Sequence, residues 1–323
     1  MNHPNSSFLV SVGMVTWNSA RDLPTCLEGL ARQSIPFELI VVDNASTDGS
    51  VSLVQSKFPQ AVITRNSKNE GFCKGHNQAI GLSHGKYYLP INPDVRLEAN
   101  YIESLLALCA DDPDIGMTGG KLRLVDSDGV ERLDTTGLFM DRKRRQYLRG
   151  HRELDTGQFE EESEVFGIDG AAPLYRRTML EDIKVLGEYF DESFFAHKED
   201  VDLAWRARLF GWRAMYTPTA VGYHRRSFRP GRRKAMADEV KREAVKNRYL
   251  LLLKNETPEG WKRDWFSILW YDFKILGFLL LFERSSLKVL SRVRQLYPQA
   301  MRWRSEIMKR KRVSGEELLK WFV

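Results

Sequence analysis

The sequence predicts an α/β protein with a mainly parallel sheet flanked by helices, followed by a helical, basic carboxyl-terminal tail. Short apolar runs alternate with amphipathic stretches in the amino-terminal part, as strands and crossover helices do around a parallel sheet. Polar clusters follow most of these runs, and ligands bind beyond the carboxyl ends of such strands. Ten Lys or Arg and one Glu lie between Arg284 and Arg312, which places a charge of +9 at one end of the chain.

The predicted elements follow one another in order along the chain. Strands are expected at Phe8–Val15, Phe37–Val42, Ala61–Arg65, Tyr87–Ile91 and Trp212–Tyr216. Helices are expected through Leu23, Leu27 and Leu30, after Thr47–Asp48, through Ala79 and Leu82, across Tyr101–Cys109 and through Val201–Leu209. The polar stretches Asp126–Arg132 and Asp141–Glu164 predict long loops, which in compact domains are usually functional or mobile.

Composition excludes several classes of protein. The chain has 323 residues, 42% of them hydrophobic and 28% charged, the balance of a globular protein rather than a disordered or membrane-spanning one. The net charge of the whole chain is +6 and that of the tail is +9, so the remainder has a net charge of −3. A nucleic-acid-binding protein would spread its positive charge over the core, so this distribution argues against a nucleic-acid partner. Cys26, Cys73 and Cys109 form no zinc pattern or disulfide framework, which indicates a reducing compartment. The amino terminus lacks the basic region of a signal peptide.

The first polar cluster follows the first two predicted strands. It comprises Thr16, Trp17, Asn18, Asp43, Asn44 and Ser46. Short polar side chains at strand ends suit hydrogen bonding to a nucleobase and ribose, and Asp43 could accept a hydrogen bond from a base imide. Thr47 or Asp48 could instead cap the next helix, which is common for these residue types.

Several motifs resemble glycosyltransferase family 2, and most closely its rhamnosyltransferase-type branch. They are Val41–Ser50, Asn69–Asn77, Asn92–Asp94, Asp169–Ala171, Phe194–Leu203 and His224, in the order of the family. The resemblance covers roughly residues 8–230 and implies a GT-A fold over 1–234. Residues 1–120 would form the nucleotide-sugar-binding half and residues 121–234 the acceptor-binding half, with a membrane-associating tail at 235–323.

The second cluster precedes a predicted helix and combines two glycines, an aromatic ring and two amides. Its members are Asn69, Gly71, Phe72, Gly75 and Asn77. Glycine allows close approach of the backbone to a ligand, and a helix amino terminus favours an anion. By resemblance, this segment lies along the nucleotide and donor sugar. A glycine-rich connecting loop is the alternative.

The third cluster, Asn92-Pro93-Asp94, closes the fourth predicted strand. Mg²⁺ or Mn²⁺ prefers carboxylate oxygens together with substrate phosphate oxygens, so Asp94 is expected to hold the cation. The sequence departs here from the commoner Asp-x-Asp form, because Asn92 replaces the first acid. His224 matches the distal histidine of the family and is a candidate second metal ligand; a structural role is the alternative.

The fourth cluster contains neighbouring carboxylates at the start of a predicted helix. Such carboxylates raise the pKa of at least one member toward the range of a useful base. The resemblance implies that Asp200 deprotonates the acceptor hydroxyl, whereas Glu199 and Asp202 orient or contact the acceptor, and that the reaction inverts the anomeric carbon. The alternative is an acidic helix start in which Asp202 pairs with Arg206.

Two further segments are candidates for substrate contacts. Asp169, Gly170 and Ala171 resemble the acceptor-side strand of the family, with a turn before a strand as the alternative. The basic loop Arg225–Lys234 could close over the donor diphosphate or meet a phosphate of the acceptor, although a solvated loop is the default.

The tail contains the apolar stretch Trp265–Phe282, which is interrupted by Asp272 and Lys274. Two central charges are costly in a spanning helix, so the stretch is expected to lie along a membrane interface. Trp261, Trp265 and Trp270 would lie near the headgroups, and the basic segment would be drawn to anionic lipids. A homo-oligomer interface or a buried helix is the alternative.

Taken together, these features predict an inverting glycosyltransferase on the cytoplasmic face of a bacterial inner membrane. The resemblance to the rhamnosyltransferase-type branch implies dTDP-rhamnose as the favoured donor, with a UDP-hexose as the alternative. The expected acceptor is a glycan or lipid-linked sugar of a cell-surface polysaccharide. Rival hypotheses are a non-catalytic scaffold and a nucleotidyltransferase. Absence of Gly-x-Gly-x-x-Gly and P-loop patterns disfavours dehydrogenases and kinases.

Overall fold

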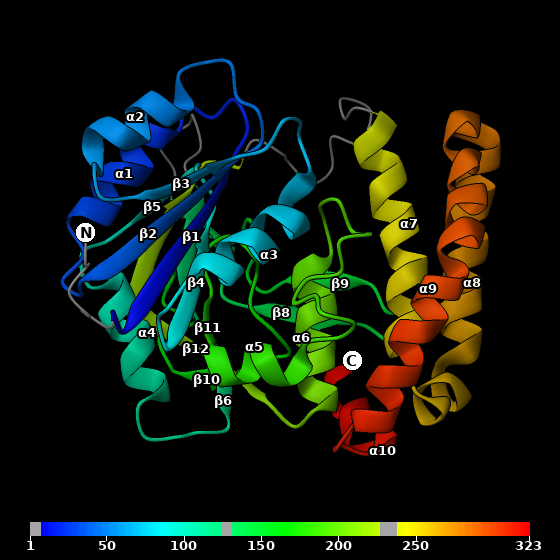
Figure 1. The fold of residues 1–323 in the computed structure, drawn as a ribbon. Helices are drawn as coiled ribbons and strands as arrows, with labels where there is room; N and C mark the ends of the chain where they lie inside the picture. Colours follow the sequence, from blue (N-terminus) through cyan, green and yellow to red (C-terminus); the bar gives the residue numbers. More distant parts are fainter. Residues whose placement is uncertain (1–7, 125–130, 227–237) are drawn as a thin grey trace.

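The computed structural model describes residues 8–124, 131–226 and 238–323, and within them a ten-stranded sheet forms the centre of the protein (Figure 1). The main path of this sheet runs β10-β12-β6-β11-β4-β1-β2-β3, while β5 pairs with β12 and β7 with β6. Its strands are β1 Val10–Thr16, β2 Phe37–Asp43, β3 Val62–Arg65, β4 Tyr87–Ile91, β5 Val95–Leu97, β6 Ile115–Leu124, β7 Arg132–Thr135, β10 Ser163–Glu164, β11 Leu174–Arg176 and β12 Arg213–His224. A separate hairpin joins β8 Leu138–Met140 to β9 Gln146–Leu148.

Helices cover this sheet and extend beyond it on one side (Figure 1). They are α1 Leu23–Ala31, α2 Ser50–Lys57, α3 Gly71–Leu82, α4 Tyr101–Cys109, α5 Arg177–Ile183, α6 Glu199–Leu209, α7 Asp238–Asn255, α8 Pro258–Phe282, α9 Lys288–Arg310 and α10 Gly315–Leu318. Short 3₁₀ turns occupy Arg284–Leu287 and Leu319–Trp321.

The predicted parallel sheet is confirmed in its amino-terminal half. Strands β3, β2, β1 and β4 are mutually parallel, and Thr16 at the end of β1 is in register with Asp43 at the end of β2. Nearly every residue of β1 and of the second half of β2 is buried, as expected for strands covered by helices on both faces. The carboxyl ends of these strands therefore form one edge.

The carboxyl-terminal half of the sheet differs from the prediction. The predicted strand Trp212–Tyr216 extends as β12 to His224, with a register shift between Tyr216 and Val221. Antiparallel β11 inserts between β4 and β6, and the expected strand at 169–172 is instead a turn before it. The polar stretch Asp141–Glu164 contains β9 and β10 rather than being loop throughout.

Some predictions fall on parts of the chain that the structure does not describe. The amino-terminal residues 1–7, most of the predicted loop Asp126–Arg132 and residues 227–234 of the basic loop lie outside the described residues. The predicted boundary between 234 and 235 also lies there.

The helices of the tail share a hydrophobic core with the sheet domain. One cluster of buried side chains joins Trp205 and Tyr216 to Leu250, Trp303 and Phe322. A second link is polar, because the Asn247 amide in α7 donates to the backbone oxygens of the segment before α6. These oxygens belong to Ala196 and His197, at 2.8 and 2.7 Å. The tail therefore packs on the segment that leads into α6.

Candidate active site

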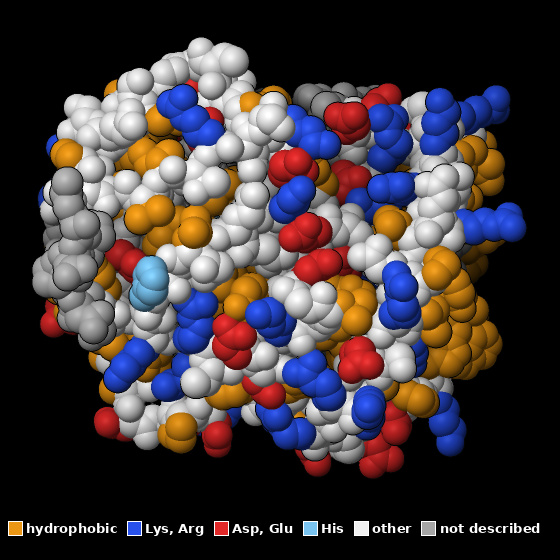
Figure 2. Space-filling view, in the orientation of Figure 1, with side chains coloured by type: hydrophobic (Ala, Val, Ile, Leu, Met, Phe, Trp, Pro, Cys, Tyr) orange, Lys and Arg blue, Asp and Glu red, His pale blue; other side chains and the backbone are white. Residues whose placement is uncertain are grey.

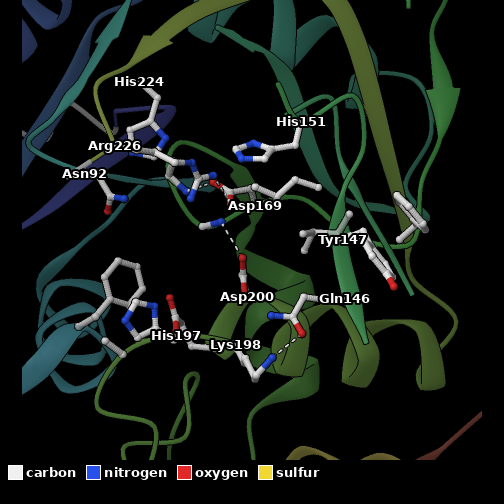
Figure 3. Close-up of a pocket in the computed structure, with 18 of the residues that line it drawn as sticks. Asn92, Gln146, Tyr147, His151, Asp169, His197, Lys198, Asp200, His224 and Arg226 are labelled. Atoms are coloured by element: carbon white, nitrogen blue, oxygen red, sulfur yellow. Dashed lines mark hydrogen bonds and ion pairs between the residues drawn. The ribbon is translucent and has the colours of Figure 1, made fainter. Parts of the chain in front are cut away.

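A cavity of about 750 Å³ lies between the sheet edge, the start of α6 and the β8–β9 hairpin (Figure 3). Nine of the predicted site residues line it: Phe72, Asn92, Asp94, Asp169, Gly170, Ala171, Glu199, Asp200 and His224. The candidate metal-binding Asp94 and the candidate base Asp200 thus face the same space, although they are far apart in the sequence.

The turn between β4 and β5 positions Asp94. The Asn92 N–H donates to the Ala171 oxygen at 2.9 Å, and the Val95 N–H donates back to the Asn92 oxygen at 3.1 Å. Strand β5 then pairs with the end of β12, with Val95 opposite His224. This pairing brings the Nε2 atom of His224 to 3.3 Å from a carboxylate oxygen of Asp94.

A buried carboxylate, Asp134 in β7, organises this end of the cavity. It accepts from His224 Nδ1 at 2.8 Å and from Arg226 Nε at 2.5 Å, and Arg226 also donates to Asp169 at 3.0 Å. Burial opposes ionisation of Asp134, but hydrogen bonds from His151 and His224 hold its pKa well below the usual range. Burial likewise opposes the charge on His224, but hydrogen bonds to Asp134 and Asp94 raise its pKa to about 9.

The start of α6 presents the second pair of carboxylates. His197 and Lys198 adopt left-handed backbone conformations, with φ of 71° and 70°, and turn the chain into the helix. The Asp200 carboxylate accepts from the Gly170 N–H at 3.2 Å and from the Val201 N–H at 2.8 Å.

Burial and neighbouring charge make these two carboxyl groups unusually basic. Burial and the charge of Asp169 raise the pKa of Asp200 to about 6. Burial and the charge of Asp200 raise the pKa of Glu199 to about 8. Both carboxyl groups therefore hold a proton more readily than an exposed carboxylate does, and they titrate as a pair.

Asp202 lies outside this cavity. Its side chain is buried and pairs with Arg206 at 3.1 Å, with Lys254 of α7 at 2.9 Å and with Asn255 at 2.7 Å. The expected contact of Asp202 with an acceptor is therefore replaced by the alternative pairing, which ties α6 to α7.

Two members of the second predicted cluster have packing roles. The Asn77 amide bonds both backbone groups of Phe190, at 2.8 and 2.9 Å, and is not directed to a ligand. A Cβ at Gly75 would lie 2.7 Å from the Val15 side chain, so this glycine allows α3 to pack against β1.

The remaining members of that cluster join α3 to the segment before α6. The Asn69 side chain accepts from the Gly71 N–H at 3.0 Å, and Phe72 N–H donates to the Phe195 oxygen at 2.8 Å. Gly71 has a φ of +86°, and a Cβ there would lie 2.6 Å from the same Phe195 oxygen. Glycine is thus required for this contact.

The first predicted cluster assembles at the ends of β1 and β2, although it does not line the cavity. Asp43 accepts from Thr16 Oγ1 at 3.0 Å and from the Ser46 N–H at 3.1 Å. Further bonds of the cluster join Asn18 N–H to Ser46 Oγ at 2.9 Å and Asn44 Nδ2 to the Gly71 oxygen at 3.2 Å. The Trp17 side chain is 57% exposed and is available to contact a ligand.

Comparison with a family model identifies the family of this chain. Residues 11–184 match the model described as "Glycosyl transferase family 2", which is more than half of the chain. The chain belongs to glycosyltransferase family 2. Among curated proteins, it is similar to the N-acetylglucosaminyl-diphospho-decaprenol L-rhamnosyltransferase of Mycobacterium tuberculosis. The two are 25% identical over 255 residues, covering 71% of this chain and 78% of the relative.

Two solved structures of other proteins share the fold of this family 2 chain. S. aureus TarS 1-349 in complex with UDP-GlcNAc matches with a TM-score of 0.58 and 18% identity, over 97% of this chain and 92% of TarS 1-349. GalNAc-T7 with UDP, GalNAc and Mn²⁺ matches with a TM-score of 0.58 and 13% identity. That match covers 77% of this chain and 48% of the other, so this chain spans about half of its length. The fold is of the GT-A type.

Several residues that line the cavity of this glycosyltransferase were not predicted. They are Leu138, Phe139, Arg145, Gln146, Tyr147, Leu148, Gly150, His151, Glu153, Ala196, His197, Lys198 and Arg226. Asp134, which accepts a hydrogen bond from His224 Nδ1, was also not predicted as a site residue. One indication in the sequence was the length of the polar stretch Asp141–Glu164, since long loops often carry function. Ala196, His197 and Lys198 lie within the motif Phe194–Leu203, and Arg226 lies within the predicted basic loop, but none of these four residues was given a role.

Proposed function

We propose that this glycosyltransferase transfers a sugar with inversion and with the help of a divalent cation. The favoured donor is dTDP-rhamnose, which would supply rhamnose. The sequence motifs resemble the rhamnosyltransferase-type branch, and one curated relative is a rhamnosyltransferase. A UDP-hexose is the alternative. The acceptor is a glycan or lipid-linked sugar of a cell-surface polysaccharide. The observation that carries the proposal is the placement of Asp94 with His224, and of Asp200, around one cavity.

The residues around Asp94 fit a divalent cation. Metal-binding histidines usually donate their second ring nitrogen to a carboxylate, and His224 bonds Asp134 in this way while Nε2 faces Asp94. Within the described ranges no group of three or more His, Cys, Asp or Glu could hold a metal alone, so donor phosphate oxygens would complete the shell. Bound Mg²⁺ or Mn²⁺ would stabilise the charge on the leaving nucleoside diphosphate.

Asp200 is suited to accept the proton of the acceptor hydroxyl. Its pKa of about 6 keeps it ionised at neutral pH yet basic enough to take a proton in the transition state. The Gly170 N–H holds one of its oxygens in place. A base on the face opposite the leaving diphosphate gives an in-line displacement, and hence inversion.

A screen of nucleotide sugars tests this function. With Mn²⁺ present, we expect release of dTDP from dTDP-rhamnose to exceed release of UDP from UDP-hexoses, and to increase when a glycan acceptor is added. A non-catalytic scaffold would release no nucleoside diphosphate from any donor. A nucleotidyltransferase would instead form pyrophosphate from a nucleoside triphosphate and a sugar phosphate.

The surface of α8 supports attachment to the cytoplasmic face of the membrane. By length and composition α8 could cross a bilayer, and only 11% of its most apolar stretch of 18 residues is buried. Asp272, however, pairs with Arg248 of α7 at 2.7 Å, so α8 also packs against the protein through a polar contact. If α8 lies in the membrane interface, its apolar face can contact lipid while the face that carries Asp272 stays packed against the protein.

Exposed apolar side chains gather along the opposite face of α8, at the edge of the molecule beside Lys and Arg side chains (Figure 2). The apolar set is Trp261, Trp265, Phe266, Leu269, Trp270, Phe273, Phe278, Leu280, Leu281 and Phe282. Exposed cations follow on the next segment, including Arg284, Lys288, Arg292 and Arg294. Anionic lipid headgroups would attract these cations, and the apolar face of α8 would contact the acyl chains.

The double variant Phe266→Asp/Phe273→Asp is expected to bind anionic vesicles at least about tenfold more weakly, since burial of two aromatic side chains is lost. Both side chains are 65% exposed, so folding should be unaffected. Sedimentation with vesicles in low salt measures the effect, and Leu53→Asp on α2 is the matched control. Equal vesicle binding by the wild type and the double variant would reject membrane attachment. If a second copy covers this face instead, the wild type alone will form dimers.

A further inference from the structure

The cavity has a cationic end that the proposed roles of Asp94 and Asp200 leave unused. Arg145 and Lys198 line it, and neither forms an ion pair with a carboxylate of the described residues. Lys198 Nζ donates to the Gln146 side chain, and in the view of Figure 3 Asp200 lies between this pair and the group formed by His224 and Arg226. The positive groups are therefore separated from the candidate metal site.

An aromatic pair extends this end of the cavity. Phe139 of β8 and Tyr147 of β9 are paired across the hairpin, and their rings stack at 5.0 Å with an interplanar angle of 14°. The Arg145 guanidinium lies over the Tyr147 ring at 4.7 Å. An apolar wall with a few directed polar groups is the usual composition of a small-molecule site.

The turn that carries Arg145 is firmly held by the tail. The neighbouring Arg144 is buried and pairs with Glu256 at 2.6 Å and with Asp264 of α8 at 2.8 Å. Arg248 of α7 donates to the Arg144 backbone oxygen at 2.9 Å. The cationic end is thus preorganised, and it is attached to the helix that carries the exposed apolar face.

We propose that Arg145 and Lys198 bind a phosphate group of the acceptor, so that the acceptor is a sugar carried on a phosphate or diphosphate. This inference rests on the proposed function, in which the donor diphosphate occupies the Asp94 end. Arg145 and Lys198 then form a second anion site, away from Asp94, that binds the acceptor. Phosphate oxygens form strong charge-assisted hydrogen bonds with guanidinium and ammonium groups.

The charge of Lys198 depends on what binds beside it. Burial and the nearby charge of Arg248 lower the pKa of Lys198 to about 7. An anion bound beside it would favour its charged form.

Binding of farnesyl diphosphate, measured by calorimetry without divalent cation or donor, tests the inference. We expect the diphosphate to bind at least about tenfold more tightly than farnesol, because only the diphosphate engages the cations. Arg145→Gln and Lys198→Gln should each reduce this difference, by up to about tenfold. Arg145 is exposed, so its substitution should not disturb folding. The matched control is Lys57→Gln, which neutralises an exposed cation on α2 and should bind as the wild type does.

Two further arms complete the experiment. N-acetylglucosamine 1-phosphate replaces the prenyl probe, and tighter binding of one or the other shows whether the phosphate comes from a lipid-linked or a soluble acceptor. Excess dTDP should not displace either probe. Displacement by dTDP, or unchanged binding in both cavity variants, would overturn the proposal. Because no donor is turned over, this outcome is distinct from failure of the donor screen, which would overturn the proposed function instead.

Discussion

Asp200→Asn is expected to lower kcat by about 10²-fold or more while leaving donor affinity nearly unchanged, because the amide cannot accept the proton of the acceptor hydroxyl. The amide keeps the shape of the carboxylate, and its oxygen can still accept from the Gly170 N–H. Steady-state kinetics at saturating acceptor, together with donor titration, separate the two effects. A parallel loss of donor affinity would contradict the role of base.

The pH dependence provides an independent check on Asp200. Its pKa is raised to about 6, so the group is protonated and inactive as a base below that pH. We therefore expect kcat/KM of the wild type to fall as pH decreases through about 6, and this limb to be absent from the residual activity of Asp200→Asn. Glu153→Gln is the matched control, since it neutralises another carboxylate that lines the cavity. A similar kinetic loss in that variant would indicate a general effect of cavity charge.

Asp94→Asn is expected to weaken donor binding by about tenfold or more when Mn²⁺ is present, and far less in its absence. The physical reason is loss of the carboxylate that we propose holds the cation. Titration of Mn²⁺ at fixed donor concentration measures the effect.

Asp134→Asn serves as the comparison for this variant. It leaves both candidate ligands in place but alters the hydrogen bond that orients His224, for which a loss of metal affinity of about 10-fold to 100-fold is typical. An unchanged Mn²⁺ titration in Asp94→Asn would refute the metal assignment, whatever the result for Asp134.

The local elements that bear the site were largely predictable from the sequence. The strand Tyr87–Ile91 and the helix Tyr101–Cys109 have the predicted bounds. The first is a continuous short apolar run, and the second repeats apolar residues at helical spacing. The rule that parallel strands end at one edge also anticipated that Thr16 would meet Asp43.

Contacts between distant segments could not be predicted in the same way. The predicted strand ended at Tyr216, whereas the structure continues it to His224 across a register shift. Pro218 lies at this irregularity, where a strand tolerates a missing backbone N–H. Asp134 lies on a strand of four residues, too short for its periodicity to show. Its importance arises from β7 pairing with β6, beside β12, which no local pattern encodes.

The fate of Asp202 illustrates the same limit at a single residue. Its position three residues into an acidic helix start suits either a substrate contact or a pair with Arg206. The decision comes from Lys254 and Asn255, which reach Asp202 from the end of α7. Only the tertiary structure brings those groups together.

The hydrogen bonds from Asn247 to Ala196 and His197 bear on how this enzyme could be shortened or recombined. A version ending at residue 234 would keep every candidate catalytic side chain but would lose the amide that fixes the backbone just ahead of Asp200. Exchange of the carboxyl-terminal helices with those of a relative would need a matching amide at that position. The carboxyl-terminal helices and the candidate active site are thus coupled as one structural unit, not as interchangeable modules.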